Sequence, residues 1–134
     1  MRLELSRRTD LAIRALRVLD HTGQRTKRPE LADAVGTTPD FLARVMTPLV
    51  HAGWVNSEVG RTGGYEIGID IGSVSMLDVI EAVEGAPDDG RCVLQGGPCE
   101  ASATCALHDA WSRARGALTR ELRETPVRAS DTRG

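Results

Sequence analysis

Residues 28–53 read RPELADAVGTTPDFLARVMTPLVHAG, and this stretch decides the fold. Pro29 suits the first turn of a short helix, and Thr38 is a natural cap for a second helix that opens at Pro39. Two short helices joined by a glycine-containing turn are typical of a helix-turn-helix. Pro48 lies inside the second helix, where a proline removes one backbone hydrogen bond, so we expect a bend there.

The flanking segments turn this pair of helices into a winged helix. Apolar residues repeat on one face of a helix over 6–21, and the polar segment 24–28 follows it as a loop. Behind the pair, 54–59 and 65–69 have the pattern of two strands around the glycine-rich turn 60–64. A hairpin directly after a helix-turn-helix is the wing of a winged helix.

The C-terminal half is predicted to hold two more helices. Ser75 caps a helix that closes at Gly85, and a loop rich in proline, glycine and aspartate covers 86–102. A last helix is expected from about Ala103, and its apolar residues form one stripe: Leu107, Ala110, Trp111, Ala114, Leu118 and Leu122. The small alanines would let a second copy approach closely, so we expect a homodimer rather than a helix folded back on its own domain. The predicted fold class is mainly α with a small β wing: a winged helix-turn-helix plus a long C-terminal dimerisation helix.

Composition restricts the classes of function. The chain has 134 residues and a net charge of −2, which by itself argues against a nucleic-acid partner. Counted by segment, ten basic against nine acidic residues give +1 over 1–70, and seven against ten give −3 over 71–134. The sequence has no long apolar run and no signal-peptide pattern, so we expect a cytoplasmic protein without a membrane partner. We see no Ser/His/Asp set, phosphate loop or carboxylate pair, and therefore expect no enzyme.

Candidate DNA-contacting residues fall into three groups. Arg61 lies in the glycine-rich wing turn, where a guanidinium can enter a minor groove. Basic residues near the first helix and before the helix-turn-helix would face phosphates: Arg7, Arg8, Arg25, Lys27 and Arg28. The face of the second helix opposite its apolar stripe carries the candidates for base edges: Thr38, Asp40, Arg44 and Thr47. Taken singly, each of these is more often an ordinary surface residue, and Asp40 also suits a helix N-terminus for reasons of charge alone.

The three cysteines form a cluster in the sequence. Cys92, Cys99 and Cys105 lie within fourteen residues, and His108 follows the last of them. An odd number of clustered thiols argues against a disulfide framework. Three neighbouring thiolates repel one another unless a cation neutralises them, so a metal centre is the simplest interpretation. We expect Cys105 and His108 to share a helix face, which keeps a zinc site open, although the C-x2-C pairs of most structural zinc sites are absent. Three cysteines without a metal are the remaining alternative.

Several of these pieces in this order resemble the Rrf2 family of winged-helix iron–sulfur regulators. The resemblance lies in residues 5–16, the pattern from Phe41 to Val55, the wing 60–65, the helix 77–85 and the three cysteines. It implies a homodimer that binds a pseudo-palindromic double-stranded DNA operator. It also implies an iron–sulfur cluster near the dimer helices, with nitric oxide or an oxidant as the signal.

Within that family the start of the chain looks like the nitric-oxide-sensing NsrR type. The similarity lies in Thr9-Asp10-Leu11 followed by Arg14. It implies that the partner subunit's Asp10 is the fourth ligand of a 4Fe–4S cluster. In IscR-type members a histidine three residues after the last cysteine takes that place, which here is His108 and would fit a 2Fe–2S cluster. Both residues are present, and we favour Asp10 with 4Fe–4S.

The sequence thus predicts a dimeric DNA-binding transcriptional regulator, a repressor, that senses nitric oxide or redox and iron status through an iron–sulfur cluster. The alternative is a zinc- or thiol-based winged-helix regulator without such a cluster. We expect four regions: a DNA-binding domain over 1–70, a connecting helix and cluster-binding loop over 71–102, a dimerisation helix over 103–124 and a disordered tail over 125–134.

Overall fold

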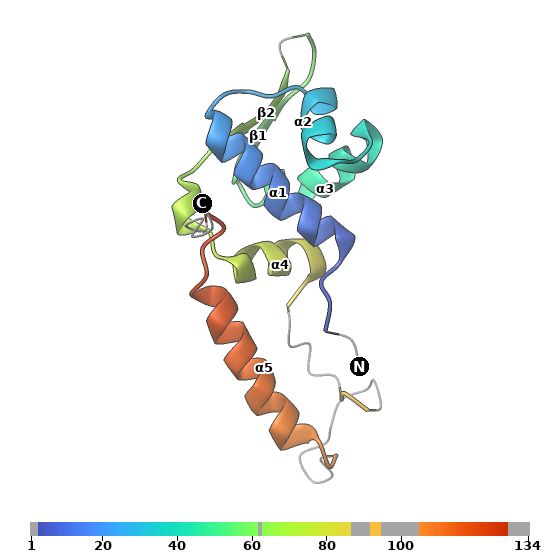
Figure 1. The fold of residues 1–134 in the computed structure, drawn as a ribbon, viewed down its shortest axis with the longest axis vertical. Helices are drawn as coiled ribbons and strands as arrows, with labels where there is room; N and C mark the ends of the chain where they lie inside the picture. The colour runs from blue at the N-terminus through green and yellow to red at the C-terminus, as the bar shows by residue number, and fades with distance from the viewer. Residues whose placement is uncertain (1–2, 62, 87–91, 95–104, 129–134) are drawn as a thin grey trace.

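The computed structural model describes residues 3–61, 63–86, 92–94 and 105–128. Its elements in chain order are α1 (Arg7–Thr22), α2 (Arg28–Val35), α3 (Pro39–His51), β1 (Val55–Glu58), β2 (Gly64–Ile67), the 3-10 turn η1 (Ile71–Ser73), α4 (Met76–Glu84) and α5 (His108–Arg123). In Figure 1, α1–α3 and the hairpin gather at one end, α4 lies beneath them, and α5 extends away. The predicted fold class, a winged helix-turn-helix followed by a long C-terminal helix, is confirmed. Among the described helices, none combines the length and the hydropathy that a membrane crossing requires.

The core forms around α1. Ser6 caps this helix by accepting a hydrogen bond from the Thr9 N–H, and Gly23 ends it with a left-handed φ of 64°. Its inward face is completely buried, and α2, α3, α4 and β2 all pack against the helix. Leu11, Leu16 and Leu19 have no exposed surface, and burying each contributes about 1.5–3 kcal/mol to folding.

Proline does not divide α3. Thr38 caps the helix by accepting from the Phe41 N–H at 3.2 Å, and the helix continues through Pro48 to His51. Pro48 lies in the last turn, where the missing N–H costs one backbone hydrogen bond near the helix end. The second helix of the helix-turn-helix is therefore a single element that includes Pro48.

The wing is a two-stranded antiparallel hairpin. Its register runs from Val55 opposite Ile67 to Glu58 opposite Gly64. A further antiparallel bridge joins Thr26 to Tyr65, with N–H to carbonyl distances of 2.8 and 2.9 Å. This single bridge attaches the hairpin to the loop before α2 and so to the helices.

Two predictions for the C-terminal half are corrected. The last helix starts at His108 rather than near residue 103, and Cys105 precedes it in a turn closed by the His108 N–H on the Cys105 carbonyl at 3.1 Å. Cys105 and His108 therefore do not share a helix face. The tail is not disordered from residue 125, because 125–128 pack against the winged helix and Val127 is completely buried. Residues 129–134 lie outside the described part of the chain.

The C-terminal end of α4 is attached to the start of α1. The Glu84 carboxylate accepts hydrogen bonds from the Ser6 N–H at 3.0 Å and from the buried Thr9 hydroxyl. Burial alone would raise the pKa of Glu84, but the hydrogen bonds from Thr9 and Ser6 outweigh it and hold that pKa below its ordinary value of 4.5. A carboxylate with a depressed pKa stabilises the fold above pH 4.5, and this contribution is lost as pH falls through the folded-state pKa.

We therefore predict a pH-dependent effect of Thr9→Val. At pH 7 the free energy of unfolding of the variant should be about 1 kcal/mol lower than that of the unaltered protein. The difference is small because Glu84 is largely exposed. At pH 3 the difference should shrink, since a protonated carboxyl no longer favours the hydroxyl donor. Urea unfolding at the two pH values measures it, and an equal loss at both would contradict the assignment.

Candidate nucleic-acid interface and cysteine site

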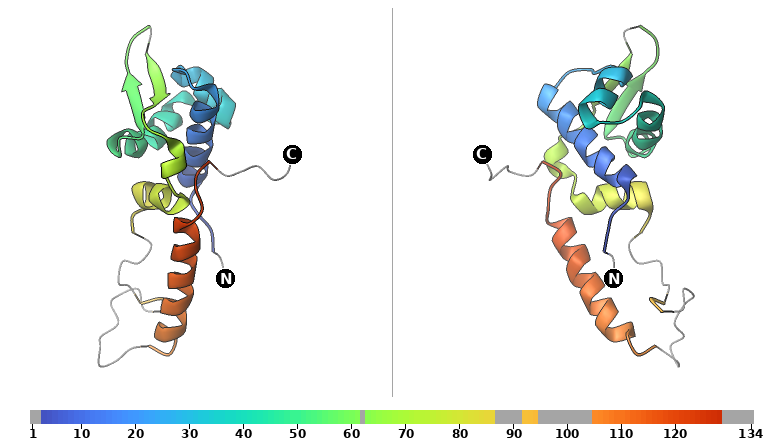
Figure 2. Two further views of the ribbon diagram at one scale, coloured as in Figure 1. Left: turned by 90° about the vertical axis from the view of Figure 1, so that its left-hand side faces the viewer. Right: turned by 45° about the vertical axis from the view of Figure 1, so that its right-hand side comes forward.

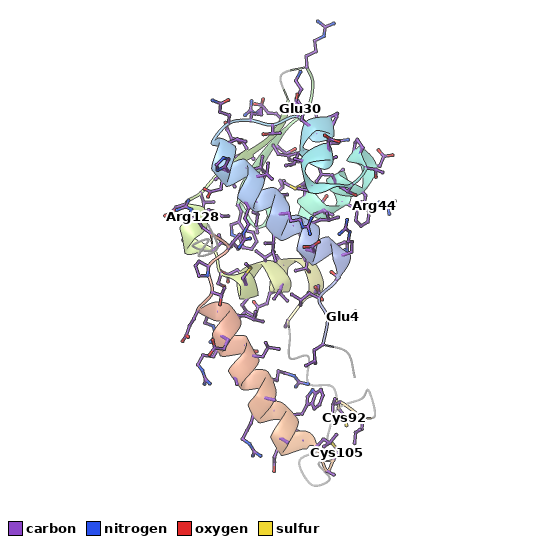
Figure 3. The ribbon with its side chains drawn as sticks, in the orientation of Figure 1. Glu4, Glu30, Arg44, Cys92, Cys105 and Arg128 are labelled. Carbon is purple, nitrogen blue, oxygen red and sulfur yellow. The ribbon has the colours of Figure 1, made fainter. Side chains whose placement is uncertain are left out.

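The outer face of α3 presents the predicted base-reading residues to solvent. Thr38, Asp40, Arg44 and Thr47 are all exposed. The Thr47 hydroxyl donates to the Ala43 carbonyl at 2.9 Å, and Thr38 serves as the helix cap, so both hydroxyls already have a structural task. Arg44 has no ion-pair partner among the described residues and lies at the outer edge of α3 in Figure 3. Of the four side chains, Arg44 and Asp40 have no hydrogen-bond or ion-pair partner among the described residues, and Arg44 supplies a fork of donors that suits a base edge.

The wing is held in place by an arginine that we expected to face phosphate. Arg25 forms ion pairs with Glu58 on β1 at 2.7 Å and with Glu66 on β2 at 3.6 Å. The guanidinium therefore bridges both strands to the loop before α2. No local sequence pattern marks this role, because the two carboxylates come from strands far along the chain. Arg61 is exposed at the wing turn.

A concave surface lies between the wing and the starts of α2 and α3. It encloses about 410 Å³ and is lined by Lys27, Arg28, Pro39 and the wing residues Val59, Gly60 and Gly64, among others. Two helices begin here, and helix N-termini favour anions. The predicted phosphate-facing residue Arg28 thus lies next to the wing. Arg7 and Arg8 are exposed in the first turn of α1, at the end of that helix away from the wing in Figure 1.

The cysteine site lies at the far end of the molecule. Figure 3 places Cys92 and Cys105 away from the winged helix, and both views of Figure 2 show residues 92–94 beside the N-terminal end of α5. Cys92 is buried, whereas Cys105 and His108 are half-buried. The third predicted ligand, Cys99, lies outside the described residues. Within the described ranges, no three His, Cys, Asp or Glu side chains converge as a metal site requires.

Asp10 lies in the winged-helix part, on α1, rather than with the cysteines. Its two carboxylate oxygens each accept from one arginine, Arg7 at 3.2 Å and Arg14 at 3.1 Å. The Asp10 side chain is 44% exposed, and each oxygen keeps a lone pair for a further partner. Asp10 on α1 and the cysteines beside the start of α5 therefore belong to separate parts of the chain.

We predict that adding one methyl group at Gly64 detaches the wing. Gly64 has a φ of 132°, and a Cβ there would lie 2.4 Å from the Thr26 carbonyl oxygen. Gly64→Ala should therefore accelerate hydrogen exchange at the Thr26 and Tyr65 amides by at least tenfold. Gly60→Ala is the matched control, because its φ of 103° imposes similar strain but no atom lies within 4 Å. Equal exchange in the two variants would show that crowding against Thr26 is irrelevant.

Comparisons with known proteins agree on one family. The family model described as Rrf2, iron-dependent transcriptional regulator, matches residues 5–129. An HTH-type transcriptional regulator of Mycobacterium tuberculosis, Rv1287, is 31% identical over 127 residues, which cover 93% of this chain and 79% of that protein. The HTH-type transcriptional regulator IscR of Klebsiella pneumoniae is 33% identical over 82 residues, or 61% of this chain and 50% of IscR.

The fold is also that of a solved regulator. The structure of CymR (YrzC), the global cysteine regulator of B. subtilis, superposes with a TM-score of 0.76. The match covers 94% of each chain at 22% sequence identity. At this identity the likeness concerns the fold alone.

Proposed function

The chain belongs to the Rrf2 family of transcriptional regulators, and from this premise we propose that it is a homodimeric repressor whose cysteine loop holds an iron–sulfur cluster. It is a regulator rather than an enzyme. The observation that carries the proposal is the extent of the family match, because residues 5–129 include the winged helix, all three cysteines and α5. We propose that nitric oxide or an oxidant is the signal.

The DNA-binding part of the proposal rests on the exposed α3 face and the wing. Arg44 and Arg61 are both exposed; Arg44 would read a base edge in the major groove, and Arg61 would enter the adjacent minor groove. Arg28 and Lys27 line the concave surface between them and would neutralise phosphates. Arg7 and Arg8 lie at the end of α1 away from the wing, and they would contact the phosphate backbone of the DNA further along the duplex.

The homodimer is supported by the uncovered stripe on α5. This helix of 16 residues, about 24 Å long, has no buried residue and packs mainly against α4 among the helices described. Leu118 is 54% exposed and Leu107 38%, and Trp111 is half-buried between them. The stripe also carries Ala110 and Ala114, which allow close approach. Pairing with a second copy of α5 would bury the apolar stripes of both chains against each other.

The donor set of the cysteine site fits an iron–sulfur cluster. Cys92 and Cys105 supply two thiols at the N-terminal end of α5, and Cys99 between them in the sequence supplies the third. When bound, the cluster would supply a centre that reacts with nitric oxide or oxidants. The fourth ligand is the partner subunit's Asp10 in our preferred assignment, with a 4Fe–4S cluster, or His108 of the same chain with 2Fe–2S.

The protein can transmit a change at the cysteine loop to the DNA-binding part through short connections. The loop follows α4 directly, and Glu84 at the end of α4 is hydrogen-bonded to Ser6 and Thr9 at the start of α1. Asp10 lies in that same first turn and holds Arg7 and Arg14. A loop that rearranges would therefore alter the start of α1, and α1 is the helix against which α3 packs.

Two mixed dimers test the fourth-ligand assignments, and the second of them separates the two, because the first keeps one complete site under either assignment. We propose co-expressing one chain carrying Asp10→Ala with a second, differently tagged chain carrying Cys92→Ala. If Asp10 acts across the dimer, the mixed dimer contains one complete site and should hold about half of the iron and sulfide of the unaltered dimer. The matched pair, His108→Ala with Cys92→Ala, should then also hold about half, because His108 is dispensable.

If His108 is the ligand within its own chain, that second mixed dimer has no complete site and should hold almost no cluster. This result would overturn the assignment to Asp10. Stoichiometric zinc without sulfide in the unaltered dimer would instead select the zinc-based alternative, and thiols without any metal would select the thiol-based one.

A further inference from the structure

The chain returns to the winged helix after α5. Residues 125–128, here called the strap, run beside the segment before α4. The Met76 N–H donates to the Thr125 carbonyl at 2.7 Å, and the Val127 N–H donates to the Val74 carbonyl at 2.9 Å. The Val127 side chain has no exposed surface. The strap is therefore an ordered part of the fold, held by backbone hydrogen bonds and by the buried Val127 side chain.

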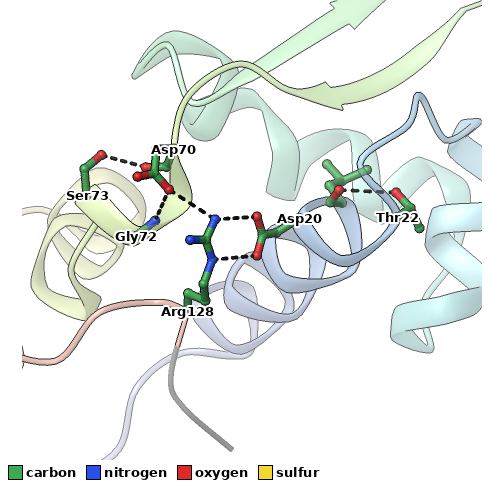
Figure 4. A network of polar contacts seen from close by, with 7 residues as sticks. Asp20, Thr22, Asp70, Gly72, Ser73 and Arg128 are labelled. Atoms are coloured by element: carbon green, nitrogen blue, oxygen red, sulfur yellow. Dashed lines mark hydrogen bonds and ion pairs between the residues drawn. The ribbon is translucent and has the colours of Figure 1, made fainter.

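Arg128 connects the strap to two other elements. Its Nε and Nη2 atoms donate to the two carboxylate oxygens of Asp20, in the last turns of α1, at 3.0 and 2.8 Å. Nη2 also pairs with the Asp70 carboxylate at 3.1 Å, in the connection from β2 to η1. Figure 4 shows the guanidinium between the two acids, and the bidentate hydrogen bond from Arg128 lowers the pKa of Asp20. A second residue of α1, Arg17, also holds the strap, because its side chain donates to the Val127 carbonyl at 2.9 Å.

These contacts give α5 a second point of attachment. Apart from its packing on α4, the helix is joined to the winged helix through the strap at its C-terminal end. A helix held at one packing face can rotate about that face, and a further attachment beyond its C-terminal end restricts this rotation. Asp20 belongs to α1 and Asp70 to the base of the wing. Through Arg128 the strap therefore fixes the orientation of α5 relative to the winged helix.

We propose that Arg128 is a positioning residue that sets the angle between α5 and the winged helix, and thereby the separation of the two α3 helices in the dimer. The inference rests on the proposed dimer and its DNA operator. In such a dimer α5 pairs with its copy, so the angle at each strap decides which spacing of half-sites both α3 helices reach together. Arg128 itself touches no DNA in this arrangement.

The consequence is a sharp dependence of affinity on operator spacing. One additional base pair between half-sites moves one half-site by about 3.4 Å and rotates it by about 35° around the duplex. A dimer with fixed angles cannot follow this movement and loses contacts in one half-site. A dimer whose α5 swivels on α4 can follow it, at the cost of weaker binding to the preferred spacing.

The test measures affinity of the full chain for a palindromic duplex that the unaltered protein selects from a random library. Two further duplexes carry one base pair more or one fewer between the same half-sites. Arg128→Gln and Asp20→Asn each remove one side of the bidentate pair. Arg120→Gln is the matched control, because it removes the same charge from an exposed position on α5. Hydrogen exchange at the Val127 amide reports whether the strap is released.

For the unaltered protein and Arg120→Gln we expect at least a tenfold loss of affinity for either altered spacing. Arg128→Gln and Asp20→Asn should lose less than threefold between spacings, bind the preferred duplex three- to tenfold more weakly, and exchange the Val127 amide faster. A tenfold spacing penalty in the Arg128→Gln dimer would overturn the positioning role. If that variant does not fold, as judged by circular dichroism, Asp20→Asn decides on the same criterion.

Failure of the proposed function looks different in this experiment. An unaltered protein that selects no duplex, or that binds one as a monomer, overturns the DNA-binding dimer and with it the inference on Arg128. An unaltered dimer with strong spacing dependence, matched by both variants, overturns the inference on Arg128 alone.

Discussion

Burial of α1 is the constraint on which the rest of the structure depends. The apolar face of this helix is completely enclosed, and α2, α3, α4 and β2 each pack against it. Its two ends carry the long-range polar contacts: Glu84 holds the first turn, and Arg128 holds Asp20 near the last. A movement of α4 or of the strap therefore displaces α1, the helix that packs against α3, because a close-packed interior does not absorb small shifts.

The molecule separates a compact DNA-binding part from an extended part that carries the cysteines. Cys92 and Cys105 lie at the N-terminal end of α5, and the opposite end of that helix leads into the strap. In the proposed dimer the cysteines of one chain would meet the α1 helix of the other. Pairing through α5 would then bring the cysteine loop of one chain into contact with the winged helix of the other. This contact would allow a fourth ligand to come from the partner chain.

Sequence reasoning reached the winged helix because local chemistry marks its boundaries. Ser6, Thr38 and Ser75 each accept the backbone N–H that a cap should accept, and Gly23 and Gly36 end helices in left-handed conformations. Contacts between distant segments carry no such mark. The strap is held by one buried valine and by an Arg128–Asp20 pair whose residues are 108 positions apart. Such contacts leave no local pattern, and the polar composition of the tail by itself predicts disorder. For the same reason no local pattern distinguishes a phosphate-facing Arg25 from the Arg25 of the structure, which pairs with two wing carboxylates.

The central claim is that a cluster at the cysteine loop controls DNA binding, and one measurement tests it most directly. The full chain is purified without oxygen, and iron, acid-labile sulfide, the visible spectrum and affinity for its selected duplex are measured before and after exposure to nitric oxide. We expect a coloured dimer containing iron and sulfide, whose visible spectrum is lost with nitric oxide while its DNA affinity changes at least tenfold. A colourless dimer that contains zinc or no metal, and whose DNA affinity nitric oxide leaves unchanged, would contradict it.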